Sequence, residues 1–249
     1  MAEALMLSTT RISTFEGARA LTAATGFFFR RDGRVYLVTS RHVLLDQASA
    51  HVPDRIEIVI HADAQNLTRT VTVQIPLYRD GRAVWRQGRD SGGEVDVAVI
   101  ALDAAVLPDT VLHAFGPEHL LASLDEVPIG TSLLLVGFPL GFYDTLHHLP
   151  VARHATVASA FGVRFQGEGY FLTDARMHRG SSGAPVVAPA AERGGPMPWT
   201  LLGVHAARLD MAGRDRLQDD VLGLNCAWYA DILMTLTGEQ EPSATGSSQ

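Results

Sequence analysis

Short runs of alternating or apolar residues, separated by turn residues, make up most of this 249-residue chain. Such runs are typical of β-strands, and their near-regular spacing favours β-barrels over alternating β–α units. Asp32-Gly33, between two of the runs, is typical of a tight hairpin. The predicted strands cover residues 9–15, 25–30, 35–39, 55–61, 68–75, 95–102, 131–138, 151–161, 169–173, 185–188, 199–206 and 221–225.

Two segments are predicted to be helical. Pro117 opens the segment 117–124, and proline is well tolerated in the first turn of a helix. Residues 227–236 have apolar side chains at helical spacing. The predicted fold class is therefore all-β, with two six-stranded antiparallel barrels and a C-terminal helix. The expected layout is one domain over 1–240, with a first barrel over about 9–105, a linker over about 106–128, a second barrel over about 129–226 and a helix over 227–236, followed by a flexible tail over 238–249.

Composition narrows the classes of protein. Apolar residues make up 47% of the chain and charged residues 19%, so a large core can form and disorder is not expected. The formal net charge is −7 and there is no run of Lys or Arg, which argues against nucleic acid as a partner. Cys226 is the only cysteine, so no intrachain disulfide can form, and this suits a reducing compartment.

The start of the chain lacks the basic residues and long apolar run of a signal peptide. No apolar stretch approaches the roughly 18 residues that a membrane span needs. We therefore expect a cytoplasmic protein with no membrane partner.

Three residue types needed for acyl transfer occur in separate segments. His42 follows a strongly apolar strand, which places it at a barrel rim. Asp96 lies inside an apolar strand, where an unpaired carboxylate would cost several kcal/mol. Ser182 lies between Gly180 and Gly183, which allow a tight loop whose backbone N–H groups point inward.

Each of these signals is weak when taken alone. A rim histidine, a strand aspartate and a Gly-Ser-Ser-Gly loop are all more often structural than catalytic. Their joint occurrence indicates a serine hydrolase, because a serine hydroxyl needs a base and the base needs a buried carboxylate to fix its tautomer.

The motifs around these residues resemble those of the trypsin-like peptidases of chymotrypsin fold. The similar segments are TGFFF at 25–29, VTSRHV at 38–43, DVAV at 96–99 and GSSGAP at 180–185. The resemblance covers about residues 9–236 and is strongest to bacterial members near the HtrA-type and glutamyl endopeptidase branches. It implies that His42 is the general base, Asp96 its orienter and Ser182 the nucleophile, with the amides of Gly180 and Ser182 as the oxyanion hole.

The sequence also departs from the family's pattern. Ser181 replaces the usual acidic or Asn residue before the nucleophile, so activation through an aspartate at that position is not expected. Ala184 replaces the second glycine after the nucleophile. No PDZ-like segment follows residue 238, and the disulfides of secreted trypsins are missing.

The resemblance also places a substrate pocket. The P1 pocket of this fold is lined by the segment before the nucleophile and the strand after it, here residues 173–178 and 202–207. His205 corresponds to a pocket histidine of members that cleave after Glu or Gln, and Arg176 lies near the pocket floor. The predicted substrate-binding residues are Arg176, His178, His205 and Ala206, with a preference for an acidic or Gln P1 residue. The alternative is that His205 is a satisfied strand histidine and that Arg176 faces solvent or pairs with Asp174.

No cofactor or metal is expected. His147 and His148 are adjacent, and neighbours on a strand face opposite ways, so they do not form a metal site. The predicted function is a serine endopeptidase acting on a protein or peptide substrate.

Two rivals remain. A catalytically silent or latent effector module on the same fold is one, and an esterase of the α/β-hydrolase class is the weaker one. Because a cytoplasmic protease must be restrained, narrow specificity or an activating protein partner is also expected.

Overall fold

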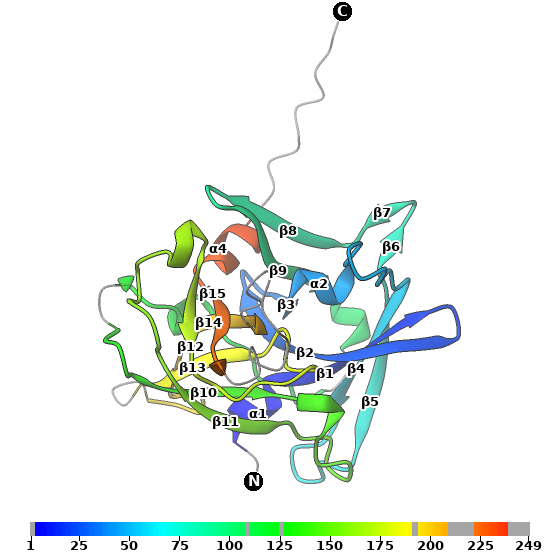
Figure 1. The fold of residues 1–249 in the computed structure, drawn as a ribbon. Helices are drawn as coiled ribbons and strands as arrows, with labels where there is room; N and C mark the ends of the chain where they lie inside the picture. Colours follow the sequence, from blue (N-terminus) through cyan, green and yellow to red (C-terminus); the bar gives the residue numbers. More distant parts are fainter. Residues whose placement is uncertain (1–2, 108–109, 125–126, 191–193, 209–221, 239–249) are drawn as a thin grey trace, which may run out of the picture.

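Two antiparallel sheets, one from each half of the chain, form the fold of the computed structural model (Figure 1). The structure describes residues 3–107, 110–124, 127–190, 194–208 and 222–238. The first sheet has the order β5-β4-β1-β2-β3-β9-β8 and the second the order β11-β10-β13-β14-β15-β12. A bridge between Val157 and Thr173 joins the two outer strands of the second sheet and closes it. The all-β, two-barrel fold is thus confirmed.

The elements follow the chain in a simple order. The first sheet contains β1 (Thr9–Glu16), β2 (Arg19–Arg31), β3 (Arg34–Thr39), β4 (Arg55–His61), β5 (Thr70–Pro76), β8 (Trp85–Asp90) and β9 (Gly93–Leu102). The second contains β10 (Ser132–Gly137), β11 (Val151–Thr156), β12 (Tyr170–Thr173), β13 (Pro185–Pro189), β14 (Trp199–Arg208) and β15 (Asn225–Tyr229). The others are the hairpin β6 (Tyr78–Arg79) and β7 (Arg82–Ala83), the helices α1 (Ala4–Leu7), α2 (Arg41–Leu44) and α4 (Ile232–Leu236), and the 3₁₀ turns η1 (Ala104–Val106), η2 (Pro117–His119), η4 (Pro139–Gly141) and η5 (Phe165–Gly167).

Several predicted elements differ from the structure. The first sheet has seven strands instead of six, because the largely polar segment β8 pairs with β9 despite its weak apolar pattern. The helix expected over 117–124 is only the short turn η2. Residues 227–229 belong to β15, which pairs with both β14 and β12, so the C-terminal helix is shorter than predicted. The strand expected over 221–225 begins at Asn225, and most of the expected tail lies outside the described residues.

Residues 24–29 of β2 and residues 97–100 of β9 are buried on both faces, which explains their apolar runs. Phe27 and Phe29 pack into a core shared with the second sheet, whereas Phe28 faces the core of the first barrel. On β9, Val97 packs into the shared core and Ala98 into the core of the first barrel. Since successive residues of a strand face opposite sides, such strands need apolar residues at every position. The shared core holds the two halves of the chain together.

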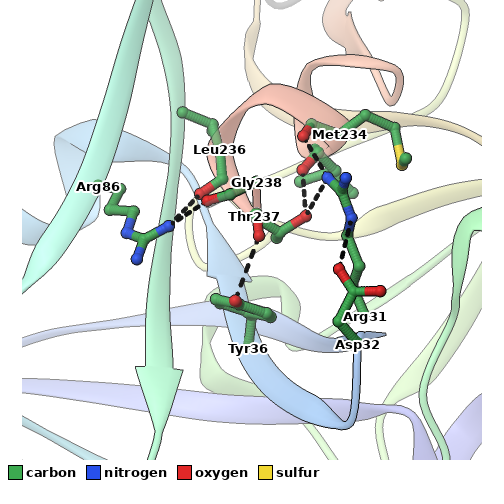
Figure 2. Close-up of polar contacts among 9 residues, drawn as sticks. Arg31, Asp32, Tyr36, Arg86, Met234, Leu236, Thr237 and Gly238 are labelled. Carbon is green, nitrogen blue, oxygen red and sulfur yellow. Dashed lines mark hydrogen bonds and ion pairs between the residues drawn. The ribbon is translucent and has the colours of Figure 1, made fainter. Parts of the chain in front are cut away.

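The C-terminal helix of the second half docks on the first barrel (Figure 2). Arg86 of β8 donates hydrogen bonds to the carbonyls of Leu236 (3.4 Å) and Gly238 (2.8 Å). Arg31 Nη1 donates to the carbonyl of Met234 at 2.5 Å, and the hydroxyl of Tyr36 donates to the carbonyl of Thr237 at 3.3 Å. These donors satisfy the carbonyls that a helix end leaves unpaired.

Among the described helices, none combines the length and the apolar character required to cross a membrane.

Candidate active site

His42 and Asp96 lie side by side because of the pairing between β3 and β9. Thr39 is opposite Ala98 in this pairing, and the helical turn α2 follows β3 directly. His42 therefore lies above the residue two positions earlier on β9, which is Asp96. The Nδ1 atom of His42 is 2.7 Å from Oδ2 of Asp96, and the backbone N–H of His42 donates to Oδ1 at 2.9 Å. Both carboxylate oxygens are thus used to hold one residue.

Asp96 controls the protonation of the His42 imidazole. Burial by itself would lower the pKa of His42, but the hydrogen bond and the negative charge of Asp96 outweigh it, so that the pKa is raised above 6.5. With Nδ1 engaged by the carboxylate, the other ring nitrogen, Nε2, is the atom that can take up a proton.

The loop that carries Ser182 is anchored by its carbonyl groups. Five successive carbonyls accept a hydrogen bond, from within the loop, from the turn η4 or from β2 of the first barrel. The bonds run to His178 O from Ser181 N (3.2 Å), to Arg179 O from Leu140 N (2.5 Å), to Gly180 O from Thr25 Oγ1 (2.7 Å), to Ser181 O from Ala184 N (2.9 Å) and to Ser182 O from Thr25 N (3.0 Å).

The amides of Gly180 and Ser182 have no acceptor within the described part of the chain. In a trans peptide group the C=O and N–H bonds point in opposite directions. Fixing the carbonyls of Arg179 and Ser181 therefore turns the N–H groups of Gly180 and Ser182 to the other side of the loop. Gly180 has φ +91°, and a Cβ there would lie 2.5 Å from the carbonyl oxygen of Phe138, so only glycine fits.

The carbonyl of His205 joins the two segments of the site. It accepts hydrogen bonds from the hydroxyl of Ser40 (3.1 Å) and from the amide of Gly183 (2.7 Å). Ser40 comes two residues before His42, and Gly183 follows Ser182. Among the described residues, His42 is hydrogen-bonded to Asp96 and not to Ser182.

The structure does not bring His205 and Ala206 into a substrate pocket. The side chain of His205 is 2% exposed, and Ala206 packs into the core between the barrels. Burial, together with the nearby His42, lowers the pKa of His205 to about 3, only partly offset by Asp96, so its imidazole is neutral. His205 therefore supplies no positive charge to a P1 side chain, which departs from the cationic pair expected with Arg176.

Arg176 and His178 do line a hollow next to the Ser182 loop, with a volume of about 540 Å³. Sequence reasoning missed Arg153 of β11, which lies in the same hollow. The sequence around Arg153 does not indicate a binding residue, because Arg153 reaches the hollow only when β11 folds beside the Ser182 loop. Arg153, Arg176 and Arg179 form no salt bridge with a described residue. The hollow is lined by Leu140, Arg153, Ala175, Arg176, Met177, His178, Arg179, Gly223 and Asn225.

Within the described ranges, no group of three or more His, Cys, Asp or Glu side chains is arranged to hold a metal ion. His147 instead contacts Asp144, with Nδ1 2.8 Å from Oδ2, and its carbonyl lies 2.7 Å from Nε2 of His61. The first contact is internal to the 142–149 loop, and the second ties the loop to β4 of the first barrel.

Comparison with known proteins finds a solved structure of similar fold and a matching family. A serine endoprotease from Yersinia pestis has a similar fold, with a TM-score of 0.53 and 16% sequence identity; the match covers 92% of this chain and 61% of that one. No curated protein sequence matches the chain. The trypsin-like peptidase domain family matches residues 24–193, which is more than half of the chain and includes His42, Asp96 and Ser182. The chain therefore belongs to the trypsin-like peptidase domain family.

Proposed function

We propose that the protein is a serine endopeptidase with Ser182 as nucleophile, His42 as general base and Asp96 as the residue that orients His42. The observation that carries the proposal is the double hydrogen bond between His42 and Asp96, at 2.7 and 2.9 Å. Such a carboxylate fixes the tautomer of the imidazole and stabilises the imidazolium that forms during acyl transfer. Membership of the peptidase family supports the same reaction class.

The proposed reaction proceeds through an acyl-enzyme. Nε2 of His42 takes the hydroxyl proton of Ser182 as the oxygen attacks the scissile carbonyl carbon. The negative charge that develops on the carbonyl oxygen is stabilised by the amides of Gly180 and Ser182, which have no acceptor within the described chain. His42 then gives the proton to the leaving amine, the C–N bond breaks, and water repeats the sequence on the ester.

We further propose that activity is gated by substrate or by a protein partner. Support comes from the contact that the base lacks: His42 has its hydrogen bond with Asp96 but none with Ser182 among the described residues. Hydrogen bonds of this kind often tighten only in the complex with substrate. A binding event that moves the Ser182 loop toward His42 would let the hydroxyl of Ser182 give its proton to Nε2 of His42.

A fluorophosphonate probe tests the proposed function directly. The probe reacts with a serine only when a base removes the hydroxyl proton, so we expect phosphonylation of Ser182 alone, located by peptide mass spectrometry. Labelling of the free protein would mean that the site is competent at rest. Labelling that requires added peptide or partner would support gating. Failure to label Ser182 under every condition would contradict the proposal and favour a catalytically silent effector.

We also propose that the P1 side chain is acidic or Gln. Arg176, Arg153 and His178 line the hollow beside the Ser182 loop, and none of the described residues that line it carries a carboxylate. The hollow is therefore locally positive, although the whole chain has a formal net charge of −7. A guanidinium recognises a carboxylate by short, charge-assisted hydrogen bonds.

In a library of peptides that differ only at P1, Glu, Asp and Gln substrates are expected to be cleaved fastest. The Arg176→Met variant should lose about 10- to 100-fold in kcat/KM for Glu at P1, because a hydrogen bond to a charged group contributes about 1.5–3 kcal/mol. Arg82→Met, on the exposed hairpin of β6 and β7, is the matched control and should change nothing. Faster cleavage after Arg or Phe would rule out the acidic pocket.

A further inference from the structure

Thr25 of β2 lies at the junction between the first barrel and the Ser182 loop. Its side chain is fully buried, with 0% exposure. Although Thr25 is about 155 residues away from the loop in sequence, its hydroxyl donates to the carbonyl of Gly180 at 2.7 Å. Its backbone N–H donates to the carbonyl of Ser182 at 3.0 Å. One residue of the first barrel therefore holds the loop on both sides of Ser181.

The hydroxyl of Thr25 also contacts the segment next to the Ser182 loop that leads into the turn η4. It accepts a hydrogen bond from the amide of Phe138 at 3.1 Å, and Phe138 immediately precedes the turn η4. In that turn, the amide of Leu140 donates to the carbonyl of Arg179. The hydroxyl thus links Gly180 to the segment that fixes the peptide group between Arg179 and Gly180.

Thr25 is itself held in place. The hydroxyl of Thr39, on the neighbouring strand β3, donates to the carbonyl of Thr25 at 2.8 Å. Thr39 ends β3, just before the turn that carries His42. A continuous set of hydrogen bonds therefore runs from the His42 segment through Thr25 to the Ser182 loop.

We propose that Thr25 is a positioning residue that fixes the direction of the Gly180 amide. Without its hydroxyl, the carbonyl of Gly180 and the amide of Phe138 both lose a buried partner. Rotation of the peptide between Arg179 and Gly180 would then point a carbonyl, in place of the N–H, at the site of developing charge. The inference rests on the proposed function, because an oxyanion is the group that this amide would bind.

Thr14 of β1 offers a matched control. Its buried hydroxyl also accepts from one amide and donates to one carbonyl, both of Thr22, at 3.1 and 3.3 Å. Thr14→Val therefore removes the same kinds of hydrogen bond from the same barrel without touching the Ser182 loop. A loss of activity caused only by a missing buried hydroxyl would appear in both variants.

The test compares Thr25→Val, Thr25→Ala and Thr25→Ser with Thr14→Val and the wild type. The Val and Ala variants should lose about 10- to 100-fold in kcat with KM nearly unchanged, part of the roughly 10²–10³-fold that removal of one oxyanion donor costs. Thr25→Ser keeps the hydroxyl and should stay within about threefold of wild type. The acid limb of the pH profile should not move, because His42 and Asp96 are untouched. Phenylboronic acid, whose tetrahedral adduct places an oxygen near the same amides, should bind less tightly to the Val and Ala variants.

Crystal structures of Thr25→Val and Thr14→Val supply a readout that does not depend on activity. We expect the peptide between Arg179 and Gly180 to be turned in Thr25→Val and unchanged in Thr14→Val. If the wild type stays inert toward fluorophosphonates under every condition, with added peptide or partner as well as without, the proposed function fails, and these structures alone still decide whether Thr25 positions the amide. If the wild type is active and the Val and Ala variants match it in kcat, or if Thr25→Ser is as impaired as Thr25→Val, the inference about Thr25 is overturned while the function stands.

Discussion

Replacement of Ser182 by alanine is expected to reduce kcat by about 10⁶-fold while leaving the fold intact. A change of this size is typical of Ser-His-Asp enzymes that lose the nucleophile, because no covalent intermediate can then form. The backbone bonds of the loop do not involve the Ser182 hydroxyl: Thr25 N–H binds the carbonyl of residue 182, which alanine retains. Hydrolysis of a peptide substrate and thermal unfolding would be measured side by side, and the melting temperature should stay close to that of wild type.

Ser181→Ala is the matched control for this variant. Ser181 is the neighbouring serine, its side chain is buried, and its hydroxyl has no hydrogen-bond partner among the described residues. Its removal should therefore leave kcat within a few-fold of wild type. If Ser181→Ala were inactive and Ser182→Ala active, the nucleophile would be the other serine and the proposed geometry would have to be redrawn.

Asp96→Asn is expected to lower kcat by about 10⁴-fold, as the corresponding change does in other triads. An amide can donate to Nδ1 of His42 and so stabilise the wrong tautomer, and it carries no charge to balance the imidazolium. In the wild type, burial lowers the pKa of His42 but Asp96 more than compensates, so the net shift is upward. The variant keeps the burial and loses the compensation, so the pKa of His42 should fall.

The pH dependence of kcat/KM checks this role of Asp96. Catalysis needs neutral His42, so wild-type activity should rise through a pKa above the usual 6.5 and be lost at lower pH. In Asp96→Asn the acid limb should move to lower pH while the plateau drops. Glu94→Gln is the control, since Glu94 lies two residues earlier on β9 and contacts Arg41 at 3.6 Å with its side chain 47% exposed. An unchanged acid limb in Asp96→Asn would mean that Asp96 does not set the protonation of His42.

Much of the fold could be predicted from local pattern. All twelve predicted strand segments overlap strands of the structure, the segment 221–225 only at Asn225, because alternation and apolar runs report burial on one or both faces. Failures occurred where tertiary pairing overrode the pattern. β8 is largely polar yet pairs with β9, and residues 227–229 have helical spacing yet form β15 between β14 and β12.

The proposed substrate pocket shows a similar division between sequence and structure. The resemblance to the family predicted that Arg176 and His178 lie beside Ser182, and both line the hollow. His205 could not be placed in this way, because the direction of a side chain on β14 depends on the bulge between His205 and Ala207 and on what packs against the strand. Arg153 had no sequence signal, since it reaches the hollow only through the pairing of β11 with β10.

The sequence by itself determined the residue types of the proposed triad and their order, His42, Asp96 and Ser182. It did so because acyl transfer needs a base, a carboxylate and a hydroxyl, and because a carboxylate inside an apolar strand is costly unless it has a partner. Tertiary structure alone decided how these groups are held. The register of β3 on β9 sets the contact between His42 and Asp96, and Thr25, far away in sequence, anchors the carbonyls on both sides of Ser181. The first contact forms when the strands of the first barrel pair, and the second forms when the two barrels pack, so no local pattern could reveal either.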